Sequence, residues 1–140
     1  MALTQGICNQ AKADFLAGVH LAADVYKIAL YPSSATYGPT TITYSATGEV
    51  ANGNGYTTGG ATLSGFSATL SSTTGVLDFT VDPTWPTSSI TARGFVIYNS
   101  SKSNKTIFVG DFGADVTSTN DTFTVTFPVP DNVTGLIRIA

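Results

Sequence analysis

The stretch ITARGFVIYNSSKSNKTIFVGDF, residues 90–112, decides the fold class of this chain. Residues 90–98 alternate between two faces, with Ile90, Ala92, Gly94, Val96 and Tyr98 on one face and Arg93, Phe95 and Ile97 among those on the other. A period of two residues is that of a β-strand. The polar run 99–104 is typical of a hairpin loop, and residues 105–112 are predicted to return antiparallel to the first strand.

A strand-and-turn pattern extends through most of the chain. From residue 24 onward, short runs rich in Val, Ile, Thr, Tyr and Phe are separated by Gly, Pro, Asn and Ser. Further strands are predicted at 25–31, around 41–44, and at 61–70, 75–81, 123–127 and 133–139. These strands predict an all-β fold: an antiparallel β-sandwich, with a jelly roll as first choice and an immunoglobulin-like topology as second.

Two stretches are predicted to interrupt the strands. Residues 48–60, GEVANGNGYTTGG, contain five glycines and two asparagines, so they are expected to form a loop or a pair of tight turns. Residues 82–86, DPTWP, carry two prolines within four residues, which forbids a continuous central strand. A sharp corner is therefore expected around Trp85, the only tryptophan.

Helical periodicity is confined to the first twenty residues, where Leu3, Ile7, Ala11 and Phe15 recur every four positions. An amphipathic helix is predicted from about 5 to 17, with Thr4 as N-cap and Gly18 as C-terminal stop. Its apolar face is expected to pack on the sheet of its own domain or to dock on another subunit. The 140 residues predict a single domain, 1–140, in which 1–20 is a helical segment and 24–140 the β-sandwich.

Composition excludes several functions. Charged residues make up 11% of the chain, against about 25% in ordinary soluble proteins, while 36 of 140 residues are Thr or Ser. Six basic residues and a net charge of −3 are too few positive charges to neutralise a run of phosphates, so no direct nucleic-acid partner is expected. A signal peptide and an apolar stretch of membrane-spanning length are missing, so no membrane partner is expected either.

The residues offer little chemistry, and no enzyme activity is expected. His20 has no Gly-x-Ser-x-Gly nucleophile elbow to serve, and Cys8 is interpreted as a small buried apolar residue. Because Cys8 is the only cysteine, neither an intramolecular disulfide nor a thiolate metal cluster can form. No cofactor is expected. A loop could gather acids around Ca²⁺, but we interpret these acids as loop residues and turn caps: Asp111, Asp115, Asp121 and Asp131.

Aromatic residues near the loops leave two interpretations open. Trp85, with Tyr37, Tyr44 and Tyr56, could form a platform for sugars or an anchor for a protein, because such rings offer rigid contact area with a polar edge. The alternative is that Trp85 packs in the corner or the core. Trp85 is the one candidate interface residue.

Several stretches together resemble small virion proteins of tailed bacteriophages, and among them the capsid cement, or decoration, proteins. The resemblance lies in ICNQAKADFLAGVH, YKIALYPSSATYG, GEVANGNGYTTGGATLSG, DPTWPTSSITARGFVIYNSSKSNKTIFVGDFG and FTVTFP, which span nearly the whole chain. These are turn-and-strand signatures without catalytic residues, so they carry no chemistry of their own.

The resemblance implies a structural role on the outer surface of the virion capsid, for a protein made in the host cytoplasm. It implies binding to the major capsid protein, stabilisation of the shell against internal DNA pressure, and a homodimer. The alternative from another class is a receptor- or glycan-binding module of a phage tail fibre that uses Trp85 and loop tyrosines against sugar rings. Fibre proteins usually trimerise through long repetitive segments, which this chain lacks.

Overall fold

The predicted hairpin lies inside a five-stranded antiparallel sheet. In this computed structural model, which describes residues 3–140, the hairpin consists of β7 (Thr91–Asn99) and β8 (Lys105–Thr117), joined by the short 3-10 helix η1 (Ser100–Lys102). The sheet has the order β1-β8-β7-β2-β3, in which the other strands are β1 (Gly6–Ile7), β2 (Tyr26–Tyr31) and β3 (Ala61–Thr62).

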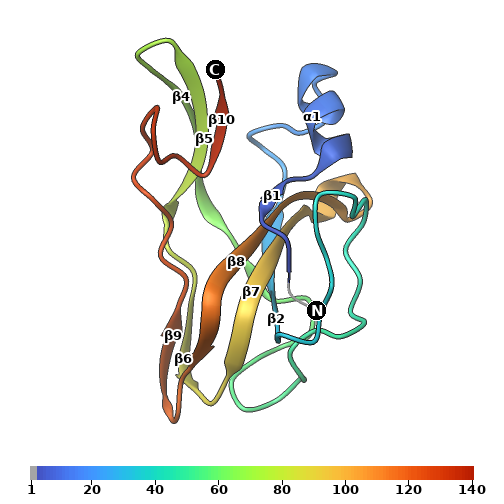
Figure 1. Ribbon diagram of the computed structural model, residues 1–140, viewed down its shortest axis with the longest axis vertical. Helices are drawn as coiled ribbons and strands as arrows, with labels where there is room; N and C mark the ends of the chain where they lie inside the picture. Colours follow the sequence, from blue (N-terminus) through green and yellow to red (C-terminus); the bar gives the residue numbers. More distant parts are fainter. Residues whose placement is uncertain (1–2) are drawn as a thin grey trace.

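A three-stranded sheet and a two-stranded ribbon form the second layer (Figure 1). The sheet has the order β10-β5-β4, from β4 (Ser64–Ser71), β5 (Thr74–Val81) and β10 (Ile137–Ile139). The ribbon pairs β6 (Thr84–Ser88) with β9 (Asp121–Thr124). Every strand pair is antiparallel, so the predicted antiparallel sandwich with one short helix is confirmed. Its jelly-roll variant stays a prediction.

Aromatic side chains hold the two layers together. Tyr26 of β2 stacks on Phe66 of β4 with ring centroids 5.3 Å apart, and it also contacts Phe79 of β5 at 5.6 Å. The buried apolar residues form one cluster that runs from Leu3 to Ile137. Residues of the N-terminal segment therefore share the core of the sandwich.

The helix is shorter than its periodicity predicts. Helix α1 spans Asn9–Leu16, and Cys8, not Thr4, is its N-cap, without a side-chain capping bond. Residues 6 and 7 pair instead with Val109 and Phe108 of β8, because sheet hydrogen bonds outweigh helix propensity there. The predicted stop is confirmed, since Gly18 follows the helix with φ of +70°. Cys8 and Ala11 are fully buried in the core cluster, so α1 packs on its own sheet.

Two predicted strands differ from the observed ones. Residues 61–70 split between the two layers at Leu63, which lies between β3 and β4. Inside β4, Gly65 has φ of +75° and leaves no room for a side chain against Thr80. Residues 41–44 form only an isolated bridge, Thr43 to Lys105. The other strand predictions hold with shifted ends, and β10 begins at Ile137, four residues later than expected.

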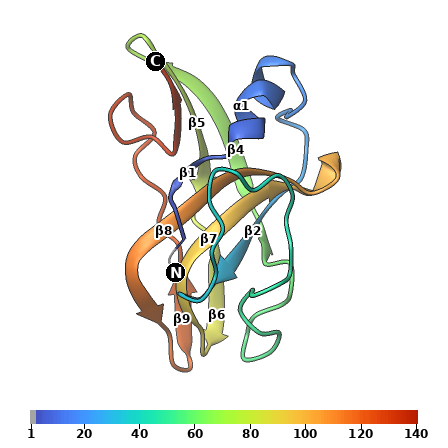
Figure 2. The ribbon, with the colours of Figure 1, turned by 45° about the vertical axis from the view of Figure 1, so that its right-hand side comes forward.

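The first predicted interruption is confirmed, and the second only in part. The 48–60 stretch has no strand and belongs to the long connection from β2 to β3, which lies over one side of the five-stranded sheet in Figure 2. The predicted corner at 82–86 is wrong for residues 84–86, which lie in β6; this strand pairs with β9 alone and has an irregular register between Trp85 and Ser88. Pro86 thus lies in a two-stranded ribbon and not in a central strand.

Candidate functional site

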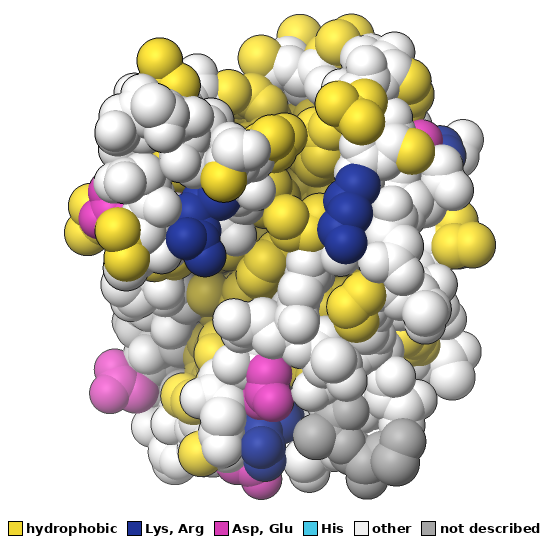
Figure 3. Space-filling view, turned by 45° about the horizontal axis from the view of Figure 1, so that its top comes forward, with side chains coloured by type: hydrophobic (Ala, Val, Ile, Leu, Met, Phe, Trp, Pro, Cys, Tyr) yellow, Lys and Arg dark blue, Asp and Glu magenta, His cyan; other side chains and the backbone are white. Residues whose placement is uncertain are grey.

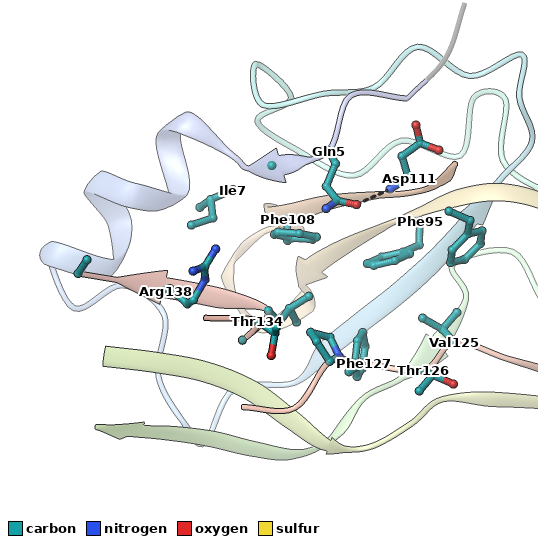
Figure 4. A pocket seen from close by; sticks show the side chains of 16 residues that line it. Gln5, Ile7, Phe95, Phe108, Asp111, Val125, Thr126, Phe127, Thr134 and Arg138 are labelled. Carbon is teal, nitrogen blue, oxygen red and sulfur yellow. Dashed lines mark hydrogen bonds between the residues drawn. The ribbon is translucent and has the colours of Figure 1, made fainter. Parts of the chain in front are cut away.

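An open cleft of about 680 Å³ lies between the two layers. We call it the aromatic cleft. One wall comes from β1, β7 and β8, and the other from the C-terminal segment around β10 (Figure 4). The lining residues are 5–7, Phe95, Phe108, Asp111, Phe112, 125–128, 134–136, Arg138 and Ala140.

Four phenylalanines form the base of the aromatic cleft. The ring of Phe95 lies at their centre, with centroid distances of 6.1 Å to Phe108, 5.7 Å to Phe112 and 6.3 Å to Phe127. Phe95 covers its cross-strand partner Gly110, where a Cβ would come within 2.2 Å of the ring. The glycine therefore lets this ring lie flat on the sheet and sets the depth of the cleft.

Among the described residues, the rim of the cleft carries one ion pair and one arginine without a salt bridge. At one end Nε of Arg93 lies 2.9 Å from Oδ1 of Asp111, so this pair is neutral. The backbone N–H of Gly113 and the guanidinium of Arg93 lower the pKa of Asp111, which keeps it ionised. Arg138 lines the cleft from β10 and forms no salt bridge with residues 3–140.

The surroundings of Arg138 leave most of its guanidinium unused. Its one protein hydrogen bond runs from Nη1 to the carbonyl of Asn132 at 3.4 Å. The neighbouring carboxylate of Asp131 lies outside salt-bridge distance, although its charge interacts with that of Arg138, and its Oδ1 accepts from the backbone N–H groups of Val133 and Thr134 at 2.8 and 2.6 Å. These bonds lower the pKa of Asp131. A guanidinium has five N–H donors, so Arg138 can bind another carboxylate.

Two of the strands that line the cleft, β1 and β10, are sheet edges. β1 pairs only with β8, and β10 pairs only with β5. Each strand therefore has hydrogen-bonding groups of its backbone on the side away from its neighbour. Among residues 3–140, apolar side chains, unpaired strand edges and an arginine without a salt bridge thus occur together here.

A second groove of about 430 Å³ lies between Phe15 of α1 and the three-stranded sheet, and Ile137 and Ile139 line it. Exposed apolar side chains surround it: Leu70 is 74% and Ile139 59% exposed. In Figure 3 a hollow with hydrophobic walls lies between two lobes, and Lys or Arg side chains lie on both sides of it.

His20 belongs to a buried polar cluster, not to a catalytic arrangement. Its Nδ1 accepts a hydrogen bond from Asn99, and its Nε2 lies 3.8 Å from Oδ2 of Asp14. Asn99 also donates to Asp24, and Lys105 contacts Asp14 at 3.2 Å. Burial lowers the pKa of His20, while the two carboxylates oppose this effect. The cluster joins the helical segment to the ends of β7 and β8.

The tyrosine hydroxyls are all used inside the protein. The carboxylate of Glu49 accepts from Tyr44 and from Tyr56, each at 2.5 Å, and also from the backbone N–H of Gly59 at 2.8 Å. The other four hydroxyls, of Tyr26, Tyr31, Tyr37 and Tyr98, donate to backbone carbonyls. Burial, together with the charge of Glu49, raises the pKa of Tyr98 to about 12. This network fixes the β2 to β3 connection on the sheet.

Trp85 lies in β6, and its side chain is buried. The residue is 5% exposed. Its ring packs edge-on against that of Phe123, with centroids 5.9 Å apart, and the ring of Tyr56 lies at a centroid distance of 6.1 Å. The packing interpretation is therefore the one that the structure supports. Since an exposed anchor needs accessible surface, an interface role for Trp85 stays a prediction that its burial does not favour.

The other candidates from the sequence are dispersed. Cys8 is fully buried, and burial raises the pKa of its thiol. Asp111 pairs with Arg93, Asp121 accepts from the backbone N–H of Thr122, and Asp131 caps a turn. Across residues 3–140, His, Cys, Asp and Glu nowhere gather in threes that could hold a metal ion. The part of the chain that is described also has no helix of the length and hydropathy needed to cross a membrane.

Sequence reasoning missed the aromatic cleft. Phe95 was placed on one face of its strand, but Phe127 and Arg138 come from segments far along the chain, and nothing local signals that they meet. The glycine opposite Phe95 is a pairing that appears only once the register of β7 and β8 is known.

Comparisons with family models, curated proteins and solved structures found no match for this chain.

Proposed function

We propose that this protein is a structural virion protein, a capsid cement protein that binds the outer surface of the shell of major capsid protein and stabilises it against internal DNA pressure. The resemblance to cement proteins of tailed bacteriophages suggests this role. The observation that carries the proposal is the aromatic cleft, which offers a protein segment apolar contact, main-chain hydrogen bonds and a free guanidinium. Such a combination suits protein recognition.

The side chains that could do chemistry are engaged in holding the fold. His20 and Cys8 are buried, and Glu49 accepts from two tyrosines and a backbone N–H. Because these groups have no access to a substrate, a binding role accounts for the surface better than catalysis does. Repetition on a lattice would turn modest contacts per subunit into a large total stabilisation of the shell.

A homodimer is part of the proposal. The second groove, with Leu70 and Ile139 exposed beside it, is the apolar surface that a second copy would cover. Sedimentation equilibrium tests this point, and a Leu70→Asp variant should shift the protein towards monomer.

The glycan-binding alternative finds less support. A sugar platform needs exposed aromatic faces and hydroxyls that are free to bond. Here Trp85 is 5% exposed, and each tyrosine hydroxyl already has an internal partner, as with Tyr37 and the carbonyl of Thr47.

The test is reconstitution on shells. DNA-filled heads stripped of this protein should release DNA at a lower temperature than complete heads, and adding the purified protein should restore resistance. Quantitative gels should find it in many copies, in proportion to the major capsid protein. Stripped heads as robust as complete ones, or recovery of the protein only with tails, would contradict the proposal.

A further inference from the structure

The aromatic cleft is bordered by two strand edges from different sheets. β1 is the last strand of the five-stranded sheet and β10 the last strand of the three-stranded sheet, and residues of both line the same cavity. Figure 4 shows β1 and β10 on opposite sides of the cavity, and the side chains of Phe108 and Phe95 lie below β1 in this view. The gap between the layers is therefore open at the point where each sheet could accept another strand.

The unpaired strand edges beside this gap favour an extended occupant over a helical one. A helix satisfies its main-chain groups internally, so it could use the phenylalanines but not the strand edges. An extended segment can use both, because its backbone pairs with an edge while every second side chain points towards the cleft base. All four phenylalanines of that base line the cavity. Phe95, Phe108 and Phe127 are mostly buried, and Phe112 is half-buried.

The guanidinium of Arg138 favours an occupant that carries an acidic side chain. Asp111 is neutralised by Arg93 at 2.9 Å, whereas Arg138 forms no salt bridge among residues 3–140 and feels the charge of Asp131 only at longer range. Its guanidinium donates to the carbonyl of Asn132 at 3.4 Å. A carboxylate from the occupant would form a charge-assisted pair with this guanidinium, and a basic side chain would be repelled.

We propose that the aromatic cleft binds an extended segment of the shell protein that carries apolar side chains at alternate positions and an Asp or Glu that pairs with Arg138. This inference rests on the proposed function, since it takes the shell protein as the partner. The segment lies between β1 and β10 and adds a strand to β10.

The first experiment measures binding of the full-length protein to shells that lack it. Arg138→Glu should weaken binding by about tenfold or more, because it replaces an attraction with a repulsion. Lys12→Glu makes the same charge change at an exposed residue that lines neither cavity, so it should bind like the wild type. Melting curves of both variants should match the wild type, since Arg138 is exposed.

The second experiment identifies the occupant. Thr126 lines the cleft and is exposed, while Cys8 is fully buried, so a photo-crosslinker attached to Thr126→Cys labels one site. Mass spectrometry should place the crosslink in a shell-protein stretch with an acidic residue among alternating apolar ones. Hydrogen exchange at 137–139 should slow on shell binding, while exchange at β3, the opposite edge of the five-stranded sheet, should not change.

The outcomes separate the two proposals. If the wild-type protein does not bind shells, the proposed function fails and this inference fails with it. If it binds shells but Arg138→Glu binds equally well, or the crosslink falls on a shell-protein helix or on a second copy of this chain, the inference alone is overturned.

Discussion

Asn99 donates a hydrogen bond to Nδ1 of His20 at 3.0 Å, although 79 residues separate the two in the chain. Because the amide nitrogen of Asn99 can only donate, the neutral imidazole carries its proton on Nε2. That Nε2 is buried without a hydrogen-bond partner, and Asp14 is 3.8 Å away. The imidazole is thus held neutral between β7 and the helical segment.

This arrangement predicts a pH dependence of stability. Burial lowers the pKa of His20 from its ordinary value of 6.5, so the unfolded chain takes up this proton more readily than the folded protein. The contribution of His20 to stability is complete above pH 6.5 and is lost as pH falls below it. The pKa values of Asp14 and Asp24 are also lowered, so the contributions of these two carboxylates to stability are lost only below about pH 3.8.

Chemical denaturation between pH 7.5 and 5 measures the effect of His20. The wild type should lose stability over this range, and His20→Gln should show a flatter profile. Equal slopes for the two proteins would contradict the prediction.

Glu49 should contribute strongly to stability through the β2 to β3 connection. Glu49→Gln removes the charge that accepts from Tyr44, Tyr56 and Gly59, and we expect a loss on the order of 2 kcal/mol in the free energy of unfolding. Asp115→Asn, at an exposed residue, removes the same charge as a control and should change little. If the two variants unfold alike, the network is not a stabilising element.

Gly110 should tolerate no side chain. Gly110→Ala places a methyl group within 2.2 Å of the Phe95 ring, so the ring must rise into the cleft, at a cost of about 1–3 kcal/mol. Gly75→Ala is a matched strand control, because its nearest neighbour would lie at 3.8 Å. Thermal melting checks stability, and shell binding should weaken at temperatures where the variant is folded. Equal melting of the two variants would contradict the close contact of Phe95 with Gly110.

Trp85→Ala should act on stability. The buried indole packs against Phe123, so its loss should cost about 3–5 kcal/mol and lower the melting temperature. Shell binding measured well below that temperature should remain close to wild type. Normal melting with weakened binding would instead make Trp85 an interface residue.

The sequence by itself determined the fold class and the central hairpin. Alternation in residues 90–98 and the polar run after it are local signals, and they correctly predict the β7 to β8 hairpin and the all-β class. Backbone chemistry was equally predictive where it is local, as at Gly18, where φ is +70° at the helix end, and in the ribbon that contains Pro86.

Only the tertiary structure decided which elements meet. Residues 6 and 7 fit a helical period, yet they pair with β8, because a sheet edge offers hydrogen bonds that a local pattern cannot reveal. The aromatic cleft also depends on contacts between segments that are distant in the sequence. Phe95, Phe127 and Arg138 come together through the packing of two layers, and the period of a strand determines the face of a side chain but not the strand that lies opposite it.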